Sequence, residues 1–297
     1  MGIHMENVTK HFGGGKGIFD LSFDVKEGEV FGYLGPNGAG KSTTIRHLMG
    51  FMKPTSGSAA INGLDCWGDR AQIQKDVGYL PGEMAFMDDL NGRQFLELLA
   101  GMRGMKDLSR RDELIERLQF DVKASIRKMS KGMKQKLGIV AAFMHDPDIL
   151  ILDEPTSGLD PLMQSVFIDL VIEEKEKGKT ILMSSHSFAE IDRSCDRAGI
   201  IKNGRLVAVE NVRDLRAVQT KIFEVAVKEE AGMARLRHSG LDVFDVNGLR
   251  AKVRVQGDYE TFIEKLSRCG VQSLDVHTQN LEDIFMHYYD QKEASAR

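Results

Sequence analysis

A glycine-rich segment that ends in a lysine and two hydroxyl residues is the clearest chemical feature of the sequence. It follows the apolar run 30–34 and reads Gly35-Pro36-Asn37-Gly38-Ala39-Gly40-Lys41-Ser42-Thr43, which fits the pattern G-x-x-x-x-G-K-[ST] completely. Glycines let successive backbone N–H groups point at phosphate oxygens, and the start of a helix adds favourable potential for an anion. We therefore predict a phosphate-binding loop for ATP, in which Lys41 reaches the β- and γ-phosphates and Ser42 supplies a hydroxyl ligand to Mg²⁺.

Two adjacent carboxylates follow a second apolar run, 149–152. Asp153 and Glu154 come at the carboxyl end of this expected strand, which is the edge where open α/β sheets bind their ligands. We expect Asp153 to hold Mg²⁺, directly or through water, and Glu154 to be the base that orients or deprotonates the attacking water. An acidic pair after a strand is more often a solvated turn, so the catalytic interpretation depends on the phosphate-binding loop.

A histidine follows a third apolar run, 180–185, which is aimed at the same edge of the sheet. His186 could hydrogen-bond the γ-phosphate or the attacking water. The other histidines have no such placement in the pattern, and structural or surface roles are expected for them.

The apolar runs and the segments between them predict the fold class. Helical spacing at 43–51 and 162–177 alternates with the buried runs, an order typical of a parallel sheet with crossover helices. Segments 3–8 and 21–25 have the patterns of short strands, and apolar residues at helical spacing over 91–146 indicate a helical subdomain. The prediction is an α/β, RecA-like P-loop NTPase core with an N-terminal antiparallel β part and a helical subdomain.

The last part of the chain has a different pattern. Beyond about Ala217 the segments alternate as strand, helix, strand, strand, helix, strand, and Asn247-Gly248 indicates a type I′ hairpin between the middle strands. We predict an ATPase domain over 3–215 and a small ferredoxin-like α+β accessory domain over 217–290. Two roles stay open for the accessory domain: an extension of a dimer interface, which we favour, or a ligand-sensing module that gates the ATPase.

Composition and charge argue against several classes of function. A length of 297 residues suits one large domain and one small one, and a formal net charge of −4 gives no general attraction to nucleic acid, so no nucleic-acid partner is expected. No apolar run approaches the roughly 20 residues needed to cross a bilayer, and no signal peptide opens the sequence. We therefore expect a cytoplasmic protein, in which the widely spaced Cys66, Cys195 and Cys269 are reduced thiols.

Taken together, these motifs resemble the nucleotide-binding subunit of ATP-binding cassette (ABC) transporters over about residues 3–215. The segment Met129-Ser130-Lys131-Gly132-Met133-Lys134-Gln135 is similar to the family signature L-S-G-G-Q-x-Q. The resemblance implies that two subunits dimerise head to tail, with Ser130 and Gly132 of one closing over the ATP held by the other. Ser130 would also cap the helix that follows. Lys131 and Met133 replace a glycine and a glutamine of the common form, which alters the expected contacts to ribose and phosphate.

Three further segments carry the resemblance. Ser157-Gly158-Leu159-Asp160 is similar to the family's D-loop, in which Asp160 would communicate across the dimer. Phe12 matches the aromatic residue that stacks on adenine. Gly82-Glu83 stands where the family has a glutamine, at the hinge that senses Mg²⁺ and pushes on the membrane partner. Glu83 could supply the metal ligand from one position later, or the segment could keep the hinge role alone.

The resemblance implies an ATPase motor subunit, and the segment Asn280-Leu-Glu-Asp-Ile-Phe285 resembles the tail of exporter-type subunits encoded apart from their membrane partner. It favours export of a drug, peptide or ion. The implied partners are a second copy of the chain and an integral-membrane permease, which would hold the protein at the inner face of the cell membrane. The alternative is a soluble cassette ATPase that acts on ribosomes or DNA. Such proteins usually carry two cassettes or long coiled-coil insertions, and this sequence has one cassette and no such insertion.

Overall fold

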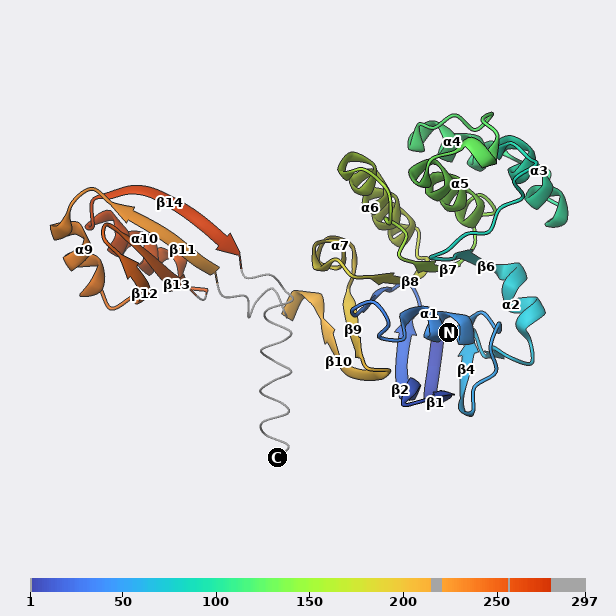
Figure 1. Cartoon of the computed structure of the whole chain (residues 1–297), viewed down its shortest axis with the longest axis horizontal. Coiled ribbons are helices and arrows are strands. Elements are labelled where there is room, and N and C mark those ends of the chain that lie inside the picture. The colour runs from blue at the N-terminus through green and yellow to red at the C-terminus, as the bar shows by residue number, and fades with distance from the viewer. Residues whose placement is uncertain (1, 215–220, 256, 279–297) are drawn as a thin grey trace. The chain divides into compact units, whose positions relative to one another are not determined.

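The chain forms two compact units, Met1–Asn211 and Val212–Arg297 (Figure 1). The computed structural model describes residues 2–214, 221–255 and 257–278. The expected boundary near residue 216 therefore lies outside the described residues, as does the tail segment Asn280–Phe285. Within the described residues, no helix combines the length and the apolar character needed to cross a bilayer.

The larger unit is built on a six-stranded sheet with the order β10-β9-β3-β8-β7-β6. Strands β9, β3, β8, β7 and β6 run parallel, and β10 pairs antiparallel with β9. The runs expected at 30–34, 149–152 and 180–183 are strands β3, β7 and β8, and each is buried along its whole length, as is typical of a parallel sheet covered on both faces. The six strands are β3 (Val30–Leu34), β6 (Val77–Leu80), β7 (Ile149–Asp153), β8 (Thr180–Ser185), β9 (Arg197–Lys202) and β10 (Arg205–Asn211).

A second, antiparallel sheet forms the N-terminal part, with the order β2-β1-β4-β5. Its strands are β1 (Gly2–Gly13), β2 (Lys16–Lys26), β4 (Ser56–Ile61) and β5 (Leu64–Asp65). The segments expected at 3–8 and 21–25 are parts of longer strands that meet in a tight hairpin, where Gly13 pairs with Lys16. The sequence pattern hides this length because Asn7 and Asp20, at φ 49° and 52°, interrupt the alternation of inward and outward side chains.

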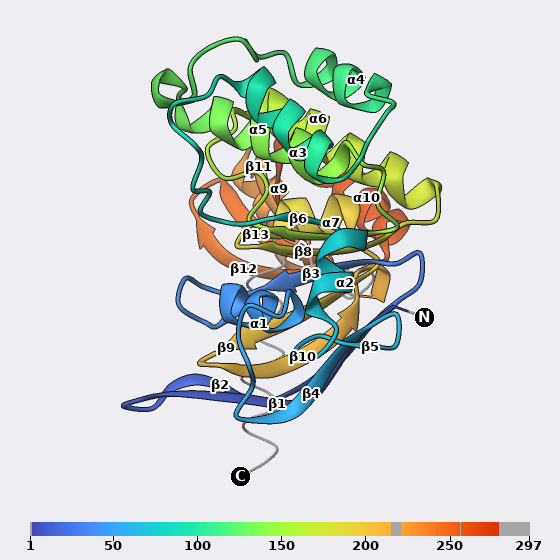
Figure 2. The ribbon, with the colours of Figure 1, turned by 90° about the vertical axis from the view of Figure 1, so that its right-hand side faces the viewer.

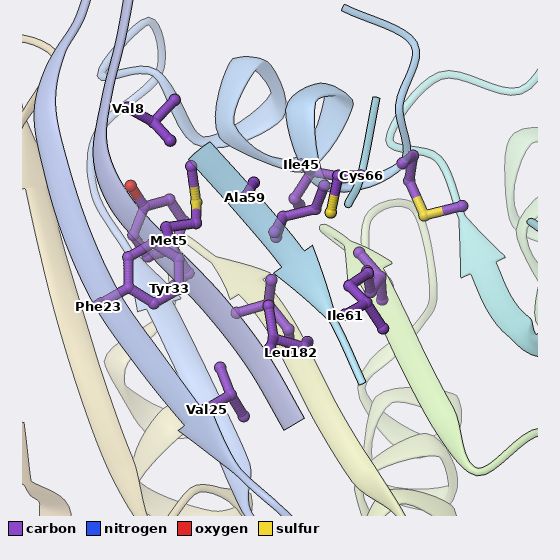
Figure 3. Close-up of a cluster of buried hydrophobic side chains, with 14 of the residues drawn as sticks. Met5, Val8, Phe23, Val25, Tyr33, Ile45, Ala59, Ile61, Cys66 and Leu182 are labelled. Carbon is purple, nitrogen blue, oxygen red and sulfur yellow. The ribbon is translucent and has the colours of Figure 1, made fainter. Parts of the chain in front are cut away.

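The main apolar core lies between the antiparallel sheet, helix α1 (Lys41–Leu48) and the central sheet. Figure 3 shows Met5 and Phe23 of the antiparallel sheet facing Tyr33 of β3, with Ile45 of α1 and Leu182 of β8 in the same cluster. The rings of Phe23 and Tyr33 stack with their centroids 5.3 Å apart. This packing fixes α1 against the end of β3, so the loop between them has two rigid ends.

The helices of the larger unit include the subdomain expected over 91–146. Figure 2 shows α3, α4 and α5 grouped at one end of the unit, and α5 contacts α3, α4 and β6. Side chains cap several helix starts: Asn91 and Gln94 form a capping box on α3, and Ser130 and Asp160 cap α5 and α6. The helices are α2 (Arg70–Asp76), α3 (Gly92–Met102), α4 (Ser109–Leu118), η1 (Ile126–Lys128), α5 (Lys131–Phe143), α6 (Pro161–Glu176) and α7 (Phe188–Ser194).

In the smaller unit, the described residues 221–278 have the element order βαββαβ and form a four-stranded antiparallel sheet with the order β12-β13-β11-β14. The prediction of a type I′ turn at Asn247-Gly248 is wrong. Asn247 pairs with Arg250, so the central residues are Gly248 and Leu249, and of these only Gly248 has positive φ, at 57°, whereas a type I′ turn needs both. The elements are β11 (Lys221–Val227), α9 (Glu230–Arg237), β12 (Asp242–Asn247), β13 (Arg250–Val255), α10 (Tyr259–Ser267) and β14 (Val271–Thr278).

Candidate functional site

The glycine-rich segment Gly35–Thr43 joins the buried end of β3 to the first residues of α1, so the expected strand, loop and helix are all present. Gly40 adopts φ 115°, and a Cβ there would lie 2.8 Å from Cγ2 of Ile18, so only glycine fits. The loop borders a cavity at the start of α1, where unpaired helix N–H groups favour an anion. The lining residues are Asn37, Gly38, Gly40, Lys41, Ser42, Thr43 and Glu154.

Lys41 is the first residue of α1 and its side chain is buried. The ammonium donates to the carbonyl of Gly35 at 2.6 Å and to that of Pro36 at 3.3 Å. It also lies 3.3 Å from Oε1 of Glu154. A buried lysine held in this way borders the cavity and could meet an anion there as a point charge, which is the role expected of a phosphate-binding lysine.

Asp153 and Glu154 lie at the carboxyl end of β7 and share one hydrogen-bonding partner, Ser184 of β8. The Ser184 hydroxyl donates to Oδ1 of Asp153 at 2.5 Å and accepts from the backbone N–H of Glu154 at 2.9 Å. All three residues lie where Asp153 and Ser184 pair across neighbouring strands. Ser184 was not predicted as a site residue, although a serine near the end of an apolar run, two residues before His186, is a signal that could have marked it.

Glu154 adopts a left-handed backbone conformation, with φ 48°. This conformation costs a non-glycine residue about 1 kcal/mol or more and is found at functional sites when the surroundings hold it. The turn away from the strand direction places Oε1 beside Lys41 and Oε2 3.6 Å from Nδ1 of His186. The structure therefore brings together Lys41, Glu154 and His186, although Lys41 lies more than 100 positions before the other two in the sequence.

His186 is exposed, and its neighbours fix the backbone on both sides. Ser185 donates to Oε2 of Glu190 at 2.7 Å and accepts from the N–H of Ser187 at 2.8 Å. The hydroxyl of Thr156 donates to the other Glu190 oxygen at 2.6 Å. Glu190 thus ties the segment that carries His186 to the segment that follows Glu154, although neither its position nor its spacing marked it in the sequence.

Two oxygen donors suit Mg²⁺ at this edge. Ser42 has an exposed hydroxyl, and Asp153 is a buried carboxylate whose Oδ1 is held by Ser184; hydroxyl and carboxylate oxygens are ligands that Mg²⁺ prefers. The backbone at Gly82 passes beside this carboxylate, because a Cβ there would lie 3.2 Å from Oδ2 of Asp153. The side chain of Glu83 is exposed. The segment therefore borders the acidic site, and the metal-ligand role of Glu83 stays a prediction.

The remaining expected ligand residues lie outside this cavity. Ser130 accepts from the N–H of Met133 at 3.2 Å and caps α5, and Asp160 accepts from the N–H of Met163 at 3.0 Å and caps α6. Both side chains are exposed, Gly132 is half-buried beside Ser130, and Phe12 is an exposed aromatic ring on β1. None of these four residues is among those that line the phosphate cavity of the described chain.

The chain is similar in sequence to ATP-binding proteins of ABC transporters. The family model described as "ABC transporter" matches residues 18–157, a stretch that contains the phosphate-binding loop, the segment 129–135 and both carboxylates. The chain is 36% identical over 249 residues to the bacitracin transport ATP-binding protein BcrA of Bacillus licheniformis, with 82% of this chain and 80% of that protein covered. It is 31% identical to the linearmycin resistance ATP-binding protein LnrL of Bacillus subtilis (strain 168), with 96% and 97% covered.

A solved structure described as the ATP-binding subunit of an ABC transporter is also similar. Its TM-score to this chain is 0.66 at 32% sequence identity, and the match covers 73% of this chain and 92% of the other. The similarity therefore extends from the motifs to the fold that positions them.

Proposed function

This chain belongs to the family of ABC transporter ATP-binding proteins, whose members bind and hydrolyse ATP, and we propose that it powers the export of a drug, peptide or ion through a separate membrane permease. The observation that carries the proposal is the placement of Glu154, which lines the phosphate cavity together with Lys41 and lies beside both Lys41 and His186. This arrangement offers a cation for the phosphates, a carboxylate for the attacking water and a second polar group beside that carboxylate.

Each residue of the site has a distinct part in hydrolysis. Backbone N–H groups of the loop and the ammonium of Lys41 bind the phosphates and stabilise the charge that spreads over the γ-phosphate oxygens. Glu154 orients the attacking water and accepts its proton, and His186 holds the γ-phosphate or the water from the other side. Ser184 holds the carboxylate of Asp153 and the backbone of Glu154 in place. Mg²⁺, when bound by Ser42 and Asp153, would neutralise phosphate charge.

A second copy of the chain would complete the site. Ser130 and Gly132 present the capped N-terminal end of α5 to solvent, away from the cavity of their own chain. Helix N-termini bind anions, and a head-to-tail dimer would place this end over the ATP held by the partner. Asp160 would communicate across the same interface, and Phe12 would stack on the adenine ring, a contact that accepts any base.

Export is favoured over import by the relatives, one of which is named for bacitracin transport and another for linearmycin resistance. We infer that the substrate is a toxic peptide or antibiotic-like molecule, and that the permease holds the chain at the inner face of the membrane. The hinge role of Gly82-Glu83 fits this coupling, since the segment leads from β6 past Asp153 towards α3.

Fractionation of the full chain in its own host tests the proposal. We expect the protein to sediment with membranes, to copurify with one polytopic membrane protein, and to hydrolyse ATP faster in that complex when bacitracin-like peptides are added. Sedimentation with ribosomes or with DNA would contradict the transport role and favour the soluble alternative.

A further inference from the structure

The first turn of α5 is attached to the segment 154–158, which begins with the catalytic carboxylate. The ammonium of Lys131 donates to the hydroxyl of Ser157 at 3.0 Å. Its aliphatic stem lies over Gly158, because a Cβ on that glycine would come within 3.0 Å of the Lys131 side chain. Lys131 thus makes both a polar and an apolar contact with the segment, although its own position on the helix is exposed.

A second attachment lies one helical turn further along. The side chain of Gln135 is buried at 2% exposure, and its Nε2 donates to the carbonyl of Pro155 at 2.7 Å and lies 3.5 Å from that of Glu154. Buried amides need such partners, because an unpaired one is costly. Lys131 and Gln135 are four residues apart and therefore share one face of α5, and this face is fastened to the catalytic segment at two points.

The two attachments matter because of how Glu154 is held. Its left-handed backbone persists only while the surrounding contacts fix it, and Gln135 reaches the carbonyls of this residue and the next. A shift of α5 along or about its axis would therefore move the peptide groups that aim the Glu154 carboxylate at Lys41 and His186. Ser130, the residue that would meet the partner's ATP, caps the same end of the same helix.

We propose that Lys131 and Gln135 are positioning residues that couple the two ATP sites of a dimer. Ser130 at the start of α5 senses ATP bound to the partner subunit, and the two attachments transmit that engagement to the Glu154 of their own chain. Hydrolysis at one site then depends on occupancy of the other. The inference rests on the proposed function, since it requires a dimer with composite sites, and it assigns a role to the lysine that replaces the usual glycine of the signature.

An ATP titration of hydrolysis by the full-length protein tests the coupling. Wild type should respond sigmoidally, with a Hill coefficient above 1 and at most about 2 for two sites. Lys131→Met keeps the stem over Gly158 and removes the ammonium, and Gln135→Met keeps the volume and removes the donor. Both should respond hyperbolically, with kcat lowered about 3- to 10-fold, as expected for loss of one hydrogen bond, and with unchanged affinity for ATP.

Lys136→Met is the matched control, since its ammonium lies near Gln119 rather than the catalytic segment, and it should behave as wild type.

A double-mutant cycle separates the contact from a general disturbance of the fold. Ser157→Ala removes the acceptor, so the Lys131→Met, Ser157→Ala double variant should be no slower than either single variant. The coupling would be overturned if the two substitutions of the double variant lowered kcat multiplicatively. It would also be overturned if Lys131→Met and Gln135→Met kept a sigmoidal response to ATP. A wild type that hydrolyses ATP without cooperativity would overturn this inference alone, whereas a wild type with no ATPase activity would overturn the proposed function as well.

Discussion

Nζ of Lys41 lies 3.3 Å from Oε1 of Glu154, so the first residue of α1 forms an ion pair with the residue that follows β7. The other Glu154 oxygen lies 3.6 Å from Nδ1 of His186. The carboxylate is therefore placed between the ammonium of Lys41 and the imidazole of His186 at the edge of the parallel sheet. A base in this position can orient a water towards an anion that is bound by the loop of Lys41.

Lys41→Ala should weaken ATP binding. A charge-assisted hydrogen bond contributes about 1.5–3 kcal/mol, so the dissociation constant is expected to rise about 10- to 100-fold. Titration calorimetry of the full chain with ATP measures this directly, with Lys106→Ala, an exposed lysine between α3 and α4, as the control. Wild-type affinity for ATP in Lys41→Ala would rule out the assignment of the loop as a phosphate-binding site.

Ser184→Ala should reduce turnover, because it leaves Oδ1 of Asp153 and the N–H of Glu154 without their shared partner. We expect kcat to fall about 10-fold, in line with the loss of roughly one hydrogen bond to a charged group, and the Mg²⁺ concentration for half-maximal activity to rise. Ser184→Thr keeps the hydroxyl and should restore most of both. Ser58→Ala, at an exposed position of β4, serves as the control. If Ser184→Ala behaves as wild type in both measurements, the serine has no part in positioning the carboxylates.

The stability of the protein should fall in mild acid through His145, which precedes β7. Burial, together with the nearby charge of Arg103, lowers the pKa of His145 to about 4. The unfolded chain binds this proton near pH 6.5, so the contribution to stability is complete above pH 6.5 and is lost as the pH falls towards 4. Between pH 7.5 and pH 5 the free energy of unfolding should fall by about 1–2 kcal/mol more in wild type than in His145→Gln.

Urea unfolding at the two pH values gives this difference, and other groups that titrate in the same range affect both proteins alike. The control is His4→Gln, which replaces an exposed histidine on β1 and should follow wild type. Equal losses of stability in wild type and His145→Gln would show that the His145 proton is not linked to folding.

The features that could be predicted from the sequence are those encoded by neighbouring residues. The strand, loop and helix around Lys41 and the cap that Ser130 places on α5 follow from local pattern and spacing. Asp153 and His186 follow from apolar runs that end at the same sheet edge. The succession of strands and helices over residues 221–278 also agrees with the alternating pattern of that segment.

The features that could not be predicted depend on register between distant strands or on a single backbone dihedral. Ser184 bonds the carboxylate of Asp153 and the backbone N–H of Glu154 because Asp153 pairs with it across β7 and β8, and nothing in either segment alone fixes that register. The left-handed φ of Glu154 has no sequence signal in a glutamate. A similar irregularity at Asp245, with φ 50°, shifts the pairing in β12 and moves the following turn to Gly248 and Leu249.

Glu154→Gln should bind ATP and fail to hydrolyse it at the normal rate. The amide keeps the shape of the side chain and removes the proton acceptor, so turnover should fall by roughly 10²- to 10⁴-fold, the usual contribution of a general base. Phosphate release by the purified full chain measures this, with ATP affinity as the internal check. Undiminished turnover would remove Glu154 from the catalytic role.

We expect ATP to join two copies of this chain around composite sites, and the mass of Glu154→Gln in solution reports whether it does. Only a nucleotide that interacts differently with the separate and the closed states can shift the balance between them. Light scattering should therefore report a dimer with ATP and a monomer with ADP, and Ser130→Arg in the same background should abolish the dimer while ATP still binds. A monomer with ATP bound at saturation would show that the chain does not form composite sites.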